Sequence, residues 1–237
     1  DSIRHSISKL SHLHFPIHDE YKKRLIQLGE NPNTIFNYGG LGAYSIKKAK
    51  FKSKSDLEDD LKINLDKKIF LITFHPTTLE KDKSKYQISN LLSALDKYKD
   101  VIKIFTSSNF DHENKIIRRK ISDFTKKNKN TFFYSSLGHL NYVSLMKIST
   151  LVIGNSSSGV LETPSLGIPT VNIGNRQKGR IISNNIINSK YEKNHIFKSI
   201  KKALNLNKKK LYKVGSPFYK TDTPQKIAKK IISFKCN

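Results

Sequence analysis

The chain has 237 residues, of which 36% are hydrophobic and 10% are aromatic. This apolar content is too high for a disordered chain, and the length exceeds the roughly 150 residues of a typical domain, so we expect a folded, soluble protein with two domains or one domain and a remaining segment. Subtracting 19 acidic from 44 basic side chains leaves a formal net charge of +25. A field of that sign attracts phosphates, nucleic acids and anionic lipids without choosing among them.

Cysteine usage and hydropathy exclude several classes of protein. The single cysteine, Cys236, excludes a disulfide framework and a cysteine-based metal site. No apolar run approaches the roughly 20 residues that a membrane span requires, and no signal peptide opens the chain. We therefore expect a cytoplasmic protein with no membrane partner, no metal and no other cofactor.

Lysine supplies nearly all of the positive charge, because the chain has only six arginines. The lysines are spread from Lys9 to Lys235, whereas a dedicated nucleic-acid surface more often clusters arginines with aromatic side chains on one face. We expect a solvated lysine surface and no nucleic-acid partner. A genuine polyanion-binding surface is the alternative.

The first 44 residues do not follow the pattern of the rest of the chain. The predicted elements are a strand over residues 10–18, a helix over 19–29 and a strand over 34–38. Asp19 is the expected N-cap of the helix and Gly29 its end, and residues 39–42 form a glycine-rich linker. Two strands and a helix cannot form a domain, so residues 1–44 are expected to be the tail of a domain that begins outside this chain.

From residue 45 onwards, short apolar runs alternate with longer amphipathic stretches, as in parallel α/β proteins. The predicted strands are residues 69–74, 101–105, 131–134, 151–153 and 170–173, and the predicted helices are residues 89–98, 114–127, 141–147 and 158–166. The intervals fit right-handed crossovers in one parallel sheet. We expect a Rossmann-like nucleotide-binding domain over 45–217, and over 218–237 a terminal helix at 223–234 that packs across the domain boundary.

The strongest local motif is the run of small residues from Gly154 to Gly159, which contains three consecutive serines. It lies between a predicted strand and a predicted helix, at the edge where parallel strands end. Small residues let the backbone approach an anion, and the hydroxyls add donors at the positive end of a helix dipole. The run predicts a diphosphate site. Because it lacks the lysine of the Walker pattern, a plain serine–glycine turn is the alternative.

Three further side chains are predicted to reach the same edge. His75 ends the first predicted strand, and Arg176 follows the last one, so a histidine and a planar guanidinium should approach the serines. Glu162 lies one turn into the helix after the serines, where it can accept hydrogen bonds from a ribose. A structural histidine, a solvated basic loop and an exposed helix glutamate are the alternatives.

The order of these motifs along the chain resembles the hydrolysing UDP-N-acetylglucosamine 2-epimerases. The segments that carry the resemblance are residues 1–5, 9–10, 12–15, 73–76, 78–80, 144–147, 152–159, 162, 164–165, 167–174 and 176–180. It implies a GT-B-like architecture, in which two Rossmann-like domains hold a nucleotide sugar between them. The present chain would be the end of the first domain and all of the second, with most of the N-terminal domain missing.

The resemblance also implies roles for individual residues. Those implied to bind substrate are Ser156, Ser157 and Arg176 at the diphosphate, Glu162 at the ribose, Leu137 and Tyr142 in the segment that meets uracil, and Asn109 and Arg4; those implied to be catalytic are His75 and Asp1. Residues 105–108 depart from the family pattern before Asn109. Asp1 matches the second member of an acidic pair whose first and catalytic member would precede this chain. We therefore expect the isolated chain to bind UDP weakly without turnover.

The resemblance implies a reaction in which UDP is eliminated from the sugar and water adds to the resulting 2-acetamidoglucal with inversion at C2. The full protein would convert UDP-N-acetylglucosamine to N-acetylmannosamine and UDP for sialic acid synthesis, as a homodimer or tetramer. The alternatives are a 2,4-diacetamido sugar on the same nucleotide, a reversible non-hydrolysing epimerase, a glycosyltransferase of the same architecture and a non-catalytic RNA-binding module. The serine run and residues 176–180 favour the hydrolysing branch.

Overall fold

The structure, a computed structural model, describes residues 2–77, 80, 82–107 and 114–234. The chain divides into two units: unit 1 comprises residues 1–49 and 216–237, and unit 2 comprises residues 50–215. The first boundary lies five residues beyond the expected 44/45, because helix α3 (Leu41–Lys48) runs through that position. The second boundary precedes the expected 217/218 by two residues.

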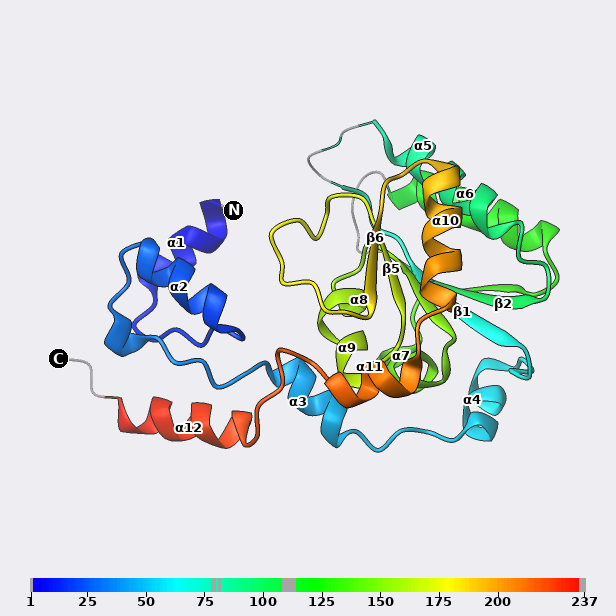
Figure 1. The fold of residues 1–237 in the computed structure, drawn as a ribbon. Coiled ribbons are helices and arrows are strands. Elements are labelled where there is room, and N and C mark those ends of the chain that lie inside the picture. Colours follow the sequence, from blue (N-terminus) through cyan, green and yellow to red (C-terminus); the bar gives the residue numbers. More distant parts are fainter. Residues whose placement is uncertain (1, 78–79, 81, 108–113, 235–237) are drawn as a thin grey trace. The chain divides into compact units, whose positions relative to one another are not determined.

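Unit 2 is built on a parallel sheet whose strands lie in the order β3-β2-β1-β4-β5-β6 (Figure 1). The strands are β1 (Lys68–Thr73), β2 (Val101–Thr106), β3 (Thr131–Tyr134), β4 (Leu151–Gly154), β5 (Thr170–Ile173) and β6 (Ile186–Ser189). Each of the five predicted strands is confirmed to within one residue at either end. The order reverses between β1 and β4, and the crevice at such a reversal is where open parallel sheets bind ligands.

Helices cover both faces of this sheet (Figure 1). They are α4 (Lys54–Leu61), α5 (Ser84–Leu95), α6 (Asn114–Lys127), α7 (Gly138–Ile148), α8 (Ser158–Leu161), α9 (Thr163–Leu166), α10 (Lys193–Leu204) and α11 (Lys208–Val214). Along β1, Phe70 and Ile72 pack in one apolar cluster with α5, α6 and α10, whereas Ile69 and Leu71 pack in the other with α4 and α7. A strand buried on both faces reads as an unbroken apolar run, which is why its prediction succeeded.

Three features of unit 2 differ from the prediction. The helix predicted over residues 89–98 is α5, which begins five residues earlier, at Ser84, and ends at Leu95. The helix expected over residues 158–166 is interrupted at Glu162, which ends α8 and caps α9, and Pro164 occupies the first turn of α9. Proline fits a helix start but breaks a helix interior, so one helix becomes two short ones. The strand β6 and the helices α4, α10 and α11 were not predicted.

Unit 1 contains α1 (Ser2–Leu10), α2 (Asp19–Gln27), α3 and α12 (Thr223–Ser233). The predicted helix at 19–29 is confirmed, but it ends at Gln27, and its N-cap is His18, whose ring accepts from Glu20 N–H, instead of the expected Asp19. The C-terminal helix is also confirmed. The two predicted strands are wrong: residues 2–10 form α1, the short 3-10 helix Pro32–Thr34 precedes the second segment, and the strand pairing there is a single bridge between His14 and Ile35. The apolar residues of α1 recur at a helical spacing that the prediction overlooked.

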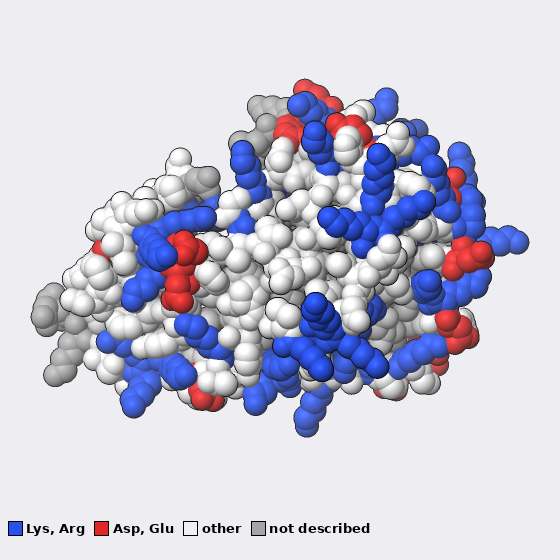
Figure 2. Space-filling view, in the orientation of Figure 1, with Lys and Arg blue, Asp and Glu red and all other residues white. Residues whose placement is uncertain are grey.

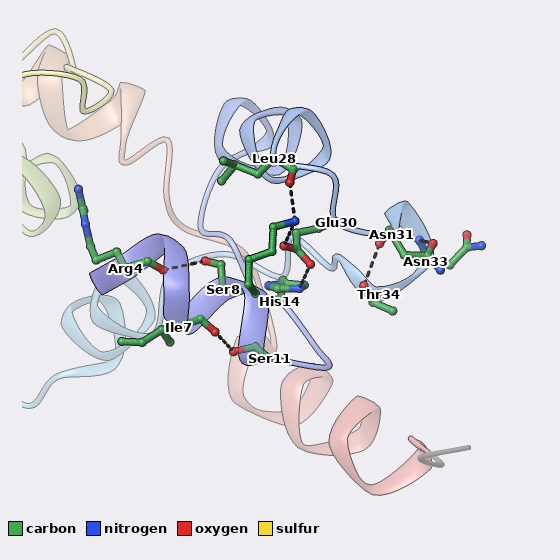
Figure 3. A network of polar contacts seen from close by, with 11 residues as sticks. Arg4, Ile7, Ser8, Ser11, His14, Leu28, Glu30, Asn31, Asn33 and Thr34 are labelled. Atoms are coloured by element: carbon green, nitrogen blue, oxygen red, sulfur yellow. Dashed lines mark hydrogen bonds and ion pairs between the residues drawn. The ribbon is translucent and has the colours of Figure 1, made fainter. Parts of the chain in front are cut away.

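A polar network joins α1 of unit 1 to the chain that follows α2 (Figure 3). Glu30 lies 2.9 Å from Lys9 Nζ and 3.2 Å from His14 Nε2, and Lys9 also donates to the carbonyl of Leu28. Lys9 and His14 hold the pKa of the Glu30 carboxyl below its ordinary value. His14 is buried, and its main chain bonds Thr34 and Phe36. His14 therefore has a structural role within unit 1.

The charged side chains are dispersed over the surface that Figure 2 displays, with Lys and Arg over much of it and fewer Asp and Glu among them. Within the described ranges, no helix is both long and apolar enough to cross a bilayer.

One lysine is an exception, because Lys103 on β2 is only 1% exposed. Its ammonium donates to the carbonyl oxygens of Tyr98 and Val101, and no carboxylate lies within ion-pair distance among the described residues. Burial, reinforced by the charge of Lys99, lowers the pKa of Lys103 below 10.5. The folded chain therefore loses this proton at a lower pH than the unfolded chain does.

We expect the stability of unit 2 to depend on pH because of this buried ammonium. Between the folded pKa of Lys103 and the unfolded value of 10.5, the unfolded state binds more protons, so the free energy of unfolding gains a contribution that rises with pH, by at most about 1.4 kcal/mol per pH unit. Urea unfolding from pH 7 to 10 measures the free energy of unfolding of the unchanged chain and of Lys103→Met. The value for the unchanged chain minus the value for Lys103→Met should rise with pH. Lys68→Met, at an exposed strand position, is the control, and a difference that falls with pH would contradict the assignment.

Candidate functional site

Unit 2 has a cavity of about 390 Å³ at the carboxyl ends of its strands. Its lining residues are Thr73, His75, Thr106, Ser107, Ser135, Ser136, Leu137, Gly138, His139, Tyr142, Ser156, Ser157, Ser158 and Arg176. They follow β1, β2, β3, β4 and β5, so the cavity surrounds the point where the strand order reverses. None of these lining residues is acidic, whereas Arg176 carries a fixed positive charge.

The serine run leaves the sheet through a conformation that only glycine allows at low cost. Gly154 has φ +137°, and a Cβ built there would lie 1.9 Å from the carbonyl oxygen of Thr73. This close approach lets Asn155 N–H donate to that same carbonyl at 3.2 Å. Ser156 and Ser157 follow, half-buried, at the cavity. Because α8 has only four residues, its dipole is weak, so the predicted anion site would depend more on the hydroxyl groups than on the helix dipole.

Asn155 connects the loops that follow β1, β4 and β5. Its side-chain amide accepts from His75 N–H at 2.7 Å and donates to the His75 carbonyl at 2.8 Å. Its own carbonyl oxygen accepts from Arg176 Nη1 at 3.1 Å and from Gln177 Nε2 at 2.8 Å. Asn155 is fully buried, so these four bonds form away from water and fix His75 and Arg176 beside the serines.

Hydroxyl groups continue from the serines across the floor of the cavity. The phenol of Tyr142, on α7, lies 2.7 Å from Ser158 Oγ, and Ser158 Oγ donates to Ser156 Oγ at 3.0 Å. Thr73 and Thr106, the last residues of β1 and β2, lie 2.5 Å apart through their hydroxyl oxygens. Burial raises the pKa of Tyr142, although the neighbouring hydroxyl groups of Ser158 and Thr73 oppose the shift. The phenol is therefore protonated at neutral pH.

Glu162 does not line the cavity but lies near it. Burial raises the pKa of its carboxyl group, and the charge of His139, a lining residue, opposes this shift. A carboxylate that has lost hydration without gaining a full partner is ready to accept hydrogen bonds. The position is compatible with the expected contact to a ribose, and that contact stays a prediction.

The structure brings together most, but not all, of the residues singled out in the sequence. Six of them line this same cavity: His75, Leu137, Tyr142, Ser156, Ser157 and Arg176. Arg4 lies on α1 in unit 1, whereas Asp1 and Asn109 lie outside the described residues. The described chain has no group of three His, Cys, Asp or Glu side chains placed to hold a metal ion.

Several residues of the site were not predicted. Thr73 and Thr106 could have been found as polar residues that end apolar strands, and Asn155 as the amide inside the serine run. Ser135 lies in the turn between β3 and α7, and His139 is the second residue of α7; the sequence has no distinct pattern at either position. Tyr191, two residues after the end of β6, also contacts loops of the site: its hydroxyl accepts from Asn175 N–H at 3.3 Å and lies 3.4 Å from Thr77 Oγ1.

The arrangement is suited to binding an anion with several oxygens. A guanidinium, two imidazoles and a set of hydroxyl donors face the cavity, and no carboxylate is among its lining residues in the part of the chain that the structure describes. Charge-assisted hydrogen bonds of this kind are about twice as strong as neutral ones. The volume of about 390 Å³ also accommodates more than a phosphate group.

Comparisons with known proteins agree with this geometry. Residues 1–232 match the family described as UDP-N-acetylglucosamine 2-epimerase. Over 190 residues, the chain is 47% identical to the GDP/UDP-N,N'-diacetylbacillosamine 2-epimerase (hydrolyzing) of Campylobacter jejuni, covering 80% of this chain and 50% of that protein. Over 200 residues, it is 44% identical to polysialic acid biosynthesis protein P7 of Escherichia coli, covering 84% and 50%.

Solved structures show the same fold. The UDP-GlcNAc 2-epimerase of Neisseria meningitidis, solved bound to UDP-GlcNAc, has a TM-score of 0.78 at 19% identity over 96% of this chain and 63% of that one. The MnaA–UDP structure of S. aureus gives 0.72 at 16% identity over 95% and 61%. The expected fold class is confirmed: the sheet is that of one half of a GT-B-like epimerase.

The chain spans about half the length of the curated relatives it matches. The match to the family extends over nearly all of its residues, through both units. The chain belongs to the UDP-N-acetylglucosamine 2-epimerase family.

Proposed function

We propose that the cavity of unit 2 binds the uridine diphosphate part of a UDP-sugar. One observation carries the proposal: His75, Arg176 and the serine pair reach one cavity from loops after three different strands, and none of the described residues that line it is acidic. Arg176 and the serine hydroxyls hold the diphosphate, and the β3–α7 turn with Leu137 meets the uracil. Glu162 accepts from the ribose. The relatives solved with UDP and with UDP-GlcNAc support this choice of nucleotide.

We infer that the whole protein is a hydrolysing 2-epimerase that converts UDP-N-acetylglucosamine to N-acetylmannosamine and UDP. Breaking the bond to the anomeric carbon leaves negative charge on the β-phosphate. Donors that already point at that position stabilise the charge as it develops, without reorganisation. Arg176, His75 and the serines act at this step. Removal of the C2 proton and addition of water require an acid and a base.

A second candidate substrate is a UDP-2,4-diacetamido sugar. The 47% identity to the Campylobacter jejuni diacetylbacillosamine epimerase favours it. The relative of the polysialic acid pathway, at 44% identity, favours N-acetylglucosamine instead. The two sugars share the diphosphate and uracil contacts, so the cavity of unit 2 is compatible with both. Identifying the free amino sugar released by the whole protein from each nucleotide sugar separates them.

The nucleotide assignment predicts that UDP stabilises the chain and uridine does not. A ligand that binds only the folded state raises the midpoint of thermal unfolding, by about 2–4 °C per kcal/mol of binding energy in a chain of this size. We expect UDP at 1 mM, about ten times its dissociation constant, to raise the midpoint by about 3–6 °C. Uridine at the same concentration should leave it unchanged.

The net charge of +25 requires a control, because any anion is attracted to such a chain. Raising the salt from about 0.15 to 0.5 M screens that general attraction but not contacts in a half-enclosed cavity. Stabilisation by UDP that persists in salt supports the proposal. Equal stabilisation by UDP and uridine, or by any nucleoside diphosphate only at low salt, would contradict it.

A further inference from the structure

We propose that Tyr142 is a positioning residue for anion binding: through Ser158, its hydroxyl directs the hydroxyl proton of Ser156 into the cavity. The inference rests on the proposed function only for the identity of the anion, a diphosphate. It gives Tyr142 a role different from a contact with uracil.

The direction of the hydrogen bonds follows from counting protons. A hydroxyl group has one proton to donate and two lone pairs that accept. Ser158 Oγ donates its proton to Ser156 Oγ at 3.0 Å. The 2.7 Å contact between Ser158 and Tyr142 therefore needs the phenol as the donor.

Ser156 stands at the end of this chain of donors. Its oxygen accepts from Ser158 Oγ and, at 3.4 Å, from Ser158 N–H, so both lone pairs are engaged. The remaining valence of the hydroxyl is its proton. Ser156 lines the cavity and is half-buried, so a ligand atom placed there receives that proton. An anion benefits most, since it accepts and never donates.

The two hydrogen bonds of this chain run in the same direction. The Tyr142 phenol donates to Ser158 Oγ, and Ser158 Oγ donates to Ser156 Oγ. Aligned hydrogen bonds polarise one another, so the last donor, the Ser156 hydroxyl, is strengthened.

Removing the phenolic hydroxyl frees Ser158 to turn its proton elsewhere, and Ser156 loses its fixed orientation. Calorimetric titration of the chain with UDP, inorganic pyrophosphate and uridine tests this. For Tyr142→Phe and for Ser158→Ala, we expect binding of UDP and of pyrophosphate to weaken about tenfold, the effect of one hydrogen bond to a charged group. The affinity of each variant for uridine should equal that of the unchanged chain. The double variant should lose no more than Ser158→Ala alone, because both changes interrupt one chain.

Tyr134→Phe is the matched control. Tyr134 ends β3 and its hydroxyl donates to the carbonyl of Leu61 at 2.7 Å, but it does not line the cavity. This variant should bind UDP as the unchanged chain does. Thermal unfolding without ligand shows that each variant is folded.

Several outcomes would overturn the inference. Equal weakening of UDP and uridine by Tyr142→Phe would mean a contact with the base or a general loss of packing. Unchanged affinity for UDP would mean that Ser156 needs no orientation, and losses that multiply in the double variant would mean two separate contacts. If the unchanged chain binds pyrophosphate but not UDP, the nucleotide assignment fails while the pyrophosphate series still tests Tyr142. Binding of neither contradicts both proposals.

Discussion

Gly154→Ala is expected to lower the free energy of unfolding by about 3 kcal/mol or more, and to abolish binding at the cavity. At φ +137°, an added Cβ would lie 1.9 Å from the Thr73 carbonyl oxygen, and it would lie 2.8 Å from the Thr73 carbonyl carbon. Neither atom can move without opening the β1–β4 pairing, in which Thr73 and Gly154 are partners. Because the serine run begins at the next residues, the displacement reaches Ser156. Urea unfolding and titration with UDP measure the two effects.

Two other glycines separate the causes of this loss. Gly179 has φ +85° with open space around its Cβ position, so Gly179→Ala should cost about 1 kcal/mol for backbone conformation alone. Gly42 lies in α3 with open space and no unusual φ, so Gly42→Ala should leave the stability equal or slightly higher. If Gly154→Ala were no worse than Gly179→Ala, the close approach to Thr73 would not be a constraint.

The sheet could be predicted from the sequence because its central strands are buried on both faces. Residues 69–72 form an unbroken apolar run, and each of them is at most 3% exposed. β6 escaped prediction because it is a short edge strand with polar residues at Asn188 and Ser189. The break at Glu162 was not predicted, because a helical spacing of apolar residues continues across it. Pro164 is the residue in the sequence that indicates a new helix start there.

The first helix of unit 1 was not predicted, because α1 has no buried face. None of the residues of α1 is buried, and Ile3, Ile7 and Leu10 are all exposed. Aromatic residues after α1 resemble strand formers, yet Phe15, Phe36 and Tyr38 pack as a cluster of rings with centroids 5.8–6.3 Å apart. Local composition favoured a strand there, and side-chain packing determined the outcome.

Some features of the site could likewise be predicted from the sequence, and others could not. Ser156, His75 and Arg176 could be predicted because residues that follow parallel strands meet at one edge, whatever the details of packing. The two roles of Asn155 could not, because its partners His75 and Arg176 are 80 and 21 residues away in the chain. The direction of the Tyr142–Ser158–Ser156 chain depends on which oxygen donates, and that follows only from three-dimensional distances.

Arg176→Ala is expected to weaken the binding of UDP about a hundredfold and to leave the binding of uridine unchanged. The guanidinium is the one arginine that lines the described cavity, and a charge-assisted pair with a diphosphate contributes about 2–3 kcal/mol. The bond from Arg176 Nη1 to the Asn155 carbonyl holds the side chain toward the serines. Arg176→Lys keeps the charge but not the planar pair of donors, so it should recover only part of the affinity, to within about tenfold of the unchanged chain.

Lys178→Ala is the matched control, because Lys178 is exposed in the same loop and its removal lowers the net charge by the same amount. It should change the affinity for UDP by less than about twofold at 0.15 M salt, since exposed charges beyond a few ångströms are screened. Arg176 also ties its loop to Asn155, so unfolding by urea must show that Arg176→Ala remains folded. Losses of equal size for Arg176→Ala and Lys178→Ala would mean that the chain attracts UDP through its overall charge. The diphosphate would then not be held at the serines.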